Sequence, residues 1–132
     1  NVYAVNFQGT ATSAKYADLA EYYLADAAYA IGTVVAVGGT AEVTAATDLN
    51  GHSVIGVVSE NPAFIMNSEL VNGTAIALKG RVKVKVCDEV KKGDRLAASN
   101  VPGYAWVDNT KSGWSFAIAL EDGIDLVEAV IL

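Results

Sequence analysis

The chain has 132 residues, of which 52% are hydrophobic, so it has the size and apolar content of one ordinary domain. Its formal net charge of −6 at pH 7 opposes general attraction to nucleic-acid phosphates. Gly, Asp or Glu interrupts every apolar stretch before it reaches the roughly 18 residues of a membrane span. The sequence therefore predicts neither nucleic-acid binding nor membrane insertion.

Residues 1 to 12 are expected to form the end of a fibre shaft. Val2, Ala4, Phe7 and Ala11 alternate loosely among polar residues, which is too little apolar mass to fold alone. Such a segment needs copies of itself, or the domain that follows, to cover it. A disordered leader is the alternative, and the sequence leaves both open. Because the chain begins at Asn1 and not at Met, we expect a piece of a longer polypeptide.

Residues 13 to 30 are expected to form a helical connector. Ser13 can cap the helix, and one apolar stripe would then consist of Tyr16, Leu19, Ala20 and Tyr23. Asp18 and Glu21 would lie one turn apart on the neighbouring face. The segment is rich in alanine, whose small side chain lets helices from several subunits approach closely.

Residues 31 to 132 are expected to form a β-rich head domain. Turn signals such as Gly38-Gly39 and Lys92-Gly93-Asp94 separate short stretches with strand character. The expected strands are 32–37 and 41–45, which form a hairpin, then 54–59, 74–78, 81–86, 95–98, 104–107, 114–120 and 126–132. Since no helix intervenes, the sequence predicts a mainly β fold, an antiparallel barrel or sandwich, with one short N-terminal α-helix.

Three segments carry a family resemblance, in the order Tyr16-Ala17-Asp18-Leu19-Ala20-Glu21, Gly32-Thr33-Val34-Val35 and Gly56-Val57-Val58-Ser59-Glu60-Asn61-Pro62. They resemble C-terminal head domains of tailed-phage tail fibres and appendages, some of which are related to self-cleaving intramolecular chaperone domains called peptidase G2. The leader Phe7-Gln8-Gly9-Thr10-Ala11-Thr12-Ser13-Ala14 is similar to the last shaft repeat before such heads. The resemblance implies a homotrimer in the virion, made in the host cytoplasm, that registers three chains, terminates the shaft and contacts other fibre or virion proteins.

Self-cleavage is also implied by the relatives, in which a hydroxyl attacks the neighbouring carbonyl while carboxylates move protons. Here Ala17 directly precedes Asp18, so the expected nucleophile is missing. We therefore expect no enzyme activity. Asp18 and Glu21 are interpreted as a remnant of the cleavage pair or as a solvated helix face beside Lys15.

The segment from Lys79 to Val86 alternates valine with cations, which is typical of a half-buried strand. Arg81, Lys83 and Lys85 would share the outer face. One hypothesis is that this face contacts an adjacent subunit, because the rest of the molecule is acidic. The other is a charged surface that blocks edge aggregation.

A polar region with aromatic residues is a candidate contact for a host-surface glycan, since aromatic faces stack on pyranose rings and polar groups bind hydroxyls. Its candidate residues are Tyr104, Trp106, Asp108, Asn109 and Trp114. The alternative is that Trp106 and Trp114 pack on facing strands of one hairpin.

No metal site or cofactor is predicted. His52 is the sole histidine and Cys87 the sole cysteine, so a ligand set for zinc is lacking. The glycines are expected in turns. They do not form a glycine-rich loop that leads into a helix beginning with Lys-Ser or Lys-Thr, so no phosphate loop is predicted either.

Two other functions stay open. Gly80-Arg81-Val82, Lys92-Gly93-Asp94-Arg95-Leu96 and Gly103-Tyr104-Ala105, together with the earlier Gly-Val segments, also resemble small trimeric β-barrels that decorate phage capsids. The other alternative is an active self-cleaving chaperone domain.

Overall fold

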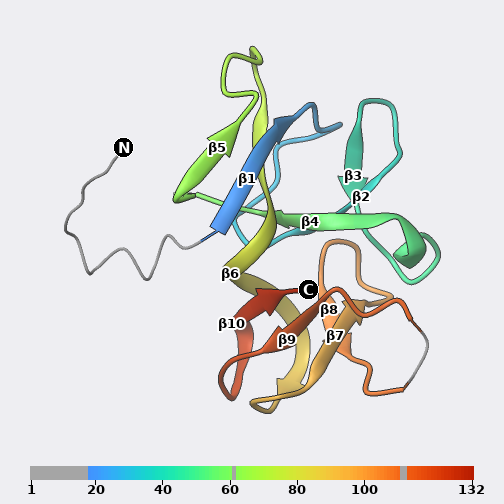
Figure 1. Ribbon diagram of the computed structural model, residues 1–132. Coiled ribbons are helices and arrows are strands. Elements are labelled where there is room, and N and C mark those ends of the chain that lie inside the picture. Colours follow the sequence, from blue (N-terminus) through green and yellow to red (C-terminus); the bar gives the residue numbers. More distant parts are fainter. Residues whose placement is uncertain (1–17, 61, 111–112) are drawn as a thin grey trace.

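The computed structural model describes residues 18–60, 62–110 and 113–132, which are almost entirely strands and turns (Figure 1). The elements are β1 (Asp18–Tyr23), β2 (Val34–Val37), β3 (Val43–Ala45), the short 3₁₀ helix η3 (Gly51–Ser53), β4 (Val54–Val58), β5 (Phe64–Met66), β6 (Thr74–Val90), β7 (Arg95–Ala98), β8 (Ala105–Val107), β9 (Ala117–Ala119) and β10 (Gly123–Ile131). The predicted mainly β fold is confirmed.

Strand β6 organises the molecule, because its 17 residues pair with different strands at its two ends. Its first part, from Thr74 to Gly80, pairs with β1, and β4 pairs there through Ile76 and Ala77. From Gly80 to Val90 it pairs with β10, and β8 joins at Val86. Figure 1 shows β6 running from the upper group of strands into the lower one.

The lower group is a closed barrel in which β6 pairs with β8, β8 with β7, β7 with β9, β9 with β10, and β10 again with β6. Val82, Val84 and Val86 of β6 point inward, as the sequence pattern predicts. Small side chains from the other strands, such as Ala117 and Ala129, complete this core. Closure leaves these strands without free edges.

The upper group contains β5, β1, the first part of β6, β4, β2 and β3. Its central strands bury both faces. Val34 and Ala36 of β2 pack in the same core as the barrel, whereas Val35 packs in a second cluster with Val43, Val58 and Ile76. Two-sided burial explains the uninterrupted apolar run Val34-Val35-Ala36.

The predicted helical connector is wrong over the described residues. Asp18–Tyr23 is strand β1, and no helix follows between residues 24 and 30. The reason is tertiary: β1 lies between β5 and β6, and both neighbours supply backbone hydrogen bonds that outweigh the weak helical preference of its residues. Residues 13–17 of that connector and the expected shaft segment, 1–12, lie outside the described residues.

The remaining strands follow the prediction with two differences. Strand β5 is absent from the predicted set, and the strands expected at 74–78 and 81–86 are the single strand β6. The expected first hairpin is confirmed, because β2 and β3 pair antiparallel with Val35 opposite Ala45. Within the described ranges, no helix is long and apolar enough to cross a membrane.

Candidate functional site

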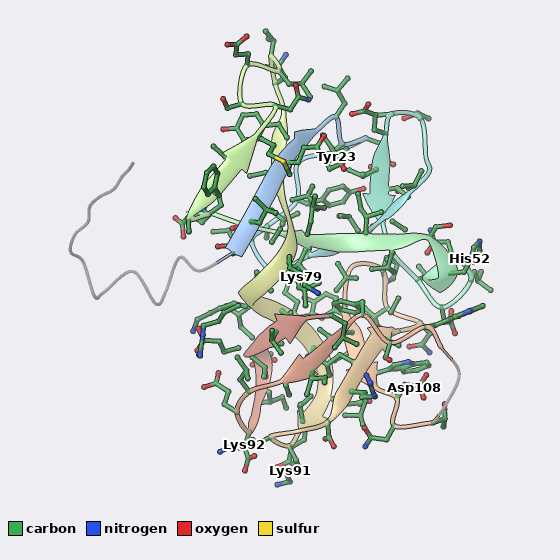
Figure 2. The ribbon with its side chains drawn as sticks, in the orientation of Figure 1. Tyr23, His52, Lys79, Lys91, Lys92 and Asp108 are labelled. Atoms are coloured by element: carbon green, nitrogen blue, oxygen red, sulfur yellow. The ribbon has the colours of Figure 1, made fainter. Side chains whose placement is uncertain are left out.

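A surface groove of about 470 Å³ lies where η3 and the start of β4 meet the segment before β9 and the end of β10. Its lining residues are Gly51, His52, Val54, Ile55, Leu78, Gly113, Trp114, Ser115, Phe116, Ile131 and Leu132. We call this the Trp114 groove. Figure 2 shows His52 on the outer edge of the turn that precedes β4.

Trp114 is the large aromatic residue of the groove, and its side chain is 45% exposed. Its ring centroid lies 5.6 Å from that of His52, with the two planes inclined at 50°. The indole also approaches the backbone of buried Gly51, where an added Cβ would lie 3.2 Å from Trp114 Cε3. Absence of a side chain at position 51 therefore lets the indole sit close to the turn.

The other four candidate glycan residues do not line this groove. Tyr104 lies beneath the Lys85 ammonium, whose Nζ is 4.5 Å from the ring centroid. Trp106 is half-buried in β8 opposite Ala97 of β7, so it does not face Trp114 across a hairpin. The structure thus separates the predicted aromatic surface into distinct places.

Asp108 and Asn109 shape the loop after β8. Asp108 Oδ1 accepts a hydrogen bond from the Thr110 backbone N–H at 3.1 Å. Asn109 accepts one from the Arg95 N–H at 2.8 Å and donates one to Asp94 Oδ1 at 3.1 Å. Asp108 thus bonds within its own loop, and Asn109 ties this loop to β7 and to the turn before it, which accounts for the presence of both residues without a ligand.

Asp94, in the turn before β7, should make the stability of the fold depend on pH. The Lys91 backbone N–H, which donates to Asp94 Oδ2 at 2.9 Å, and then the Asn109 amide hold the pKa of this carboxyl below its ordinary value. A carboxyl whose pKa is lowered on folding stabilises the fold above its unfolded-state pKa, and this contribution is lost as the pH falls through the folded-state pKa.

We therefore predict that Asp94→Asn destabilises the protein at neutral pH, and that its difference from wild type disappears on acidification, because protonated Asp94 can no longer offer a charged acceptor. Urea unfolding at a series of pH values measures the difference. Asn109→Ala should reduce this pH dependence in part. A difference that stays constant down to the acid limit would contradict the assignment.

The expected acid pair is not a pair in the structure. Asp18 is only 3% exposed and its Oδ2 accepts a hydrogen bond from Ser59 Oγ at 2.6 Å. Glu21 accepts one from the Tyr23 hydroxyl at 3.2 Å. Residues three apart on a strand point to opposite faces. The prediction that Asp18 and Glu21 are neighbours on one helix face is therefore wrong. Sequence reasoning had no signal for Ser59, which is 41 positions away.

Asp18 and Ser59 should be energetically coupled. We predict that Asp18→Ala and Ser59→Ala each lower the free energy of unfolding by about 1–3 kcal/mol, since each leaves a buried or half-buried group without its partner. The double variant should lose less than the sum, because the second change removes a group that is already unsatisfied. Denaturant unfolding of the four proteins measures this, and strict additivity would show that the contact contributes nothing.

The cationic strand has the predicted alternation, with its cations outside and its valines in the core. Arg81 Nη1 lies 3.2 Å from Glu128 Oε1 of β10. Lys85 Nζ donates to Thr33 Oγ1 at 3.3 Å and lies over Tyr104. Lys83 is exposed, with Glu128 opposite it in register. Two of the three cations therefore have partners in their own chain.

An exposed apolar face on β1 and β5 was not predicted. Leu19 and Phe64 are partners in the parallel register, and Met66 follows two residues later on the same side of β5. Their exposed fractions are 36%, 71% and 39%. We call Leu19, Phe64 and Met66 the β1–β5 apolar face.

Among residues 18–60, 62–110 and 113–132, no group of three or more His, Cys, Asp or Glu side chains is placed to hold a metal ion. Cys87 is a half-buried free thiol of β6.

Together, the closed barrel, the upper group of strands and the long strand β6 that both share define a mainly β domain with a barrel. One solved structure with this fold is the crystal structure of the bacteriophage phi29 gene product 12 C-terminal fragment. It matches with a TM-score of 0.67 and 15% sequence identity, and the match covers 87% of this chain and all of that one. No protein-family model matches the sequence. No curated protein matches it either.

Proposed function

We propose that this chain is a structural domain of a phage tail fibre or tail appendage. The observation that carries the proposal is the fold that this chain shares with the C-terminal fragment of bacteriophage phi29 gene product 12, over the whole of that fragment. The sequence segments that resemble tail-fibre head domains support the same class independently, because that resemblance depends on the residues and not on the fold.

The finer proposal is a homotrimer that registers three chains, terminates the fibre and contacts the host surface. The β1–β5 apolar face supports subunit contact, since contiguous exposed apolar side chains commonly mark an interaction surface. With a net charge of −6, copies of the chain repel one another over much of their surface, so an uncharged face is suited to bringing them together. It is better suited than the cationic strand, of which two cations already have partners.

The test uses the parent particle. Mass spectrometry of purified virions should detect this sequence, and gold-labelled antibodies against the domain should mark fibres or appendages in electron micrographs. Label on the capsid shell would favour the decoration protein instead. Light scattering of the domain at several concentrations should give the mass of three chains, and a monomer throughout would contradict the trimer.

Self-cleavage has one observation in its favour, the Ser59 hydroxyl that donates to buried Asp18. We nevertheless propose that the chain is not an enzyme, because position 17 is alanine. Mass spectrometry of the freshly expressed parent chain decides the matter. A break before Asp18 that Ser59→Ala abolishes would establish cleavage, whereas an intact mass supports a structural role.

A further inference from the structure

We infer that the Trp114 groove binds a neutral N-acetylhexosamine unit of a surface glycan. This inference rests on the host contact proposed above and names the ligand class for it. It follows from three features of the groove: an exposed indole supported by its neighbours, a mostly polar lining that includes a few aliphatic side chains, and the absence of charged side chains among the described lining residues.

The indole of Trp114 provides a platform for a sugar ring. Aromatic faces attract the C–H face of a pyranose, and 45% of the Trp114 side chain is open to solvent. The ring is held in place by the Gly51 backbone and by the inclined imidazole of His52. Because the side chain is already fixed, binding costs little further rotamer entropy.

The wall and rim of the groove complement the substituents of such a sugar. Val54, Ile55 and Leu78 supply aliphatic surface, which suits the methyl of an acetamido group. The His52 ring and the Ser115 hydroxyl supply hydrogen-bonding groups for sugar hydroxyls and for the amide. Most of the exposed lining is polar, which suits the hydroxyls of a sugar, and the aromatic and aliphatic surface is confined to these few side chains.

Charge selects among sugars. None of the described lining residues is an aspartate, glutamate, lysine or arginine. A phosphate, a sulfate, a uronic acid or an ammonium would therefore lose hydration without gaining an ionic partner. The volume of about 470 Å³ lies within the range of small-ligand sites, about 300–1,000 Å³. The fit is thus to one or two neutral sugar rings.

The test compares three monosaccharides that share a ring. The domain is titrated with N-acetylglucosamine, glucose and glucosamine, and binding is followed by saturation-transfer NMR and by indole fluorescence. We expect N-acetylglucosamine to bind tightest and cationic glucosamine weakest. Trp114→Ala should weaken binding about tenfold or more. Trp106→Phe is the matched control, because Trp106 lies outside the groove, and it should bind as wild type does.

His52→Ala provides a second variant, since His52 is an exposed turn residue whose loss leaves the core intact, and it should weaken binding several-fold. Absence of saturable binding, unchanged binding by both groove variants, or glucosamine binding as tightly as N-acetylglucosamine would overturn the inference. An indole signal that changes on dilution alone would also overturn it, because a second copy would then occupy the groove. Antibody labelling of virions does not depend on sugar binding. Labelled fibres together with a domain that binds no sugar would therefore overturn this inference and leave the proposed function standing.

Discussion

Phe64→Asp is expected to convert the proposed trimer into monomers that remain folded. Phe64 is 71% exposed at the centre of the β1–β5 apolar face, so a carboxylate there is hydrated in the monomer and buried without a partner in the assembly. Aromatic anchors in interfaces typically contribute about 2 kcal/mol or more, which weakens association by about 30-fold at each contact. Light scattering and sedimentation velocity measure the change in mass.

Leu49→Asp is the matched control for this result. Leu49 is 87% exposed in the turn before η3 and is not part of the β1–β5 apolar face, so replacing this large apolar side chain by the same charged one should leave the assembly intact. Circular dichroism should show the same strand content in both variants. Dissociation by Leu49→Asp, or a trimer that survives Phe64→Asp, would exclude the β1–β5 apolar face as the interface.

Gly56→Ala is expected to lower the free energy of unfolding by about 3 kcal/mol or more. A Cβ at position 56 would lie 2.0 Å from the carbonyl oxygen of Ala77 and 3.0 Å from Ile76 Cγ2. Neither can yield easily, because Ala77 belongs to the paired backbone of β6 and Ile76 is fully buried. Overpacking a rigid core typically costs about 1–3 kcal/mol, and separating two paired strands adds to that. Thermal and urea unfolding measure the loss.

Gly93→Ala tests whether steric contact is the cause. Gly93 has a positive φ of 93°, but nothing lies within 4 Å of an added Cβ. The variant should therefore lose only the cost of a left-handed backbone, about 1–2 kcal/mol. If Gly93→Ala is as harmful as Gly56→Ala, strand separation is not the reason for the effect at position 56.

Strands with one buried face were predictable from local pattern. The alternation of valine and cations from Arg81 to Val86 fixed both the strand and its inner face, since a strand turns successive side chains to opposite sides. The glycine-rich turn after Val37 likewise fixed the first hairpin. In these places the local alternation and the turn residues agree with the environment that the neighbouring strands provide, so the sequence contains the necessary information.

The candidate site was only partly predictable. Trp114 could be named as a candidate because tryptophan is a residue type that binds sugars. Its neighbours Gly51 and His52, however, come from a turn about 60 positions earlier. Of the residues close to Trp114 in sequence, Asp108 bonds within its own loop and Asn109 bonds to Arg95 and Asp94, all outside the groove. Proximity along the chain was thus a poor guide to which side chains share a surface.

The sequence by itself determined the mainly β class, most of the strands, and the inner and outer faces of the alternating strand from Arg81 to Val86. These features depend on local periodicity and on turn residues. Tertiary structure alone decided that Asp18–Tyr23 is a strand, that Asp18 binds Ser59, and that Trp114 meets His52. The physical reason is that each depends on a partner far along the chain. A segment with mixed preferences takes the conformation in which such partners satisfy its backbone and bury its side chains.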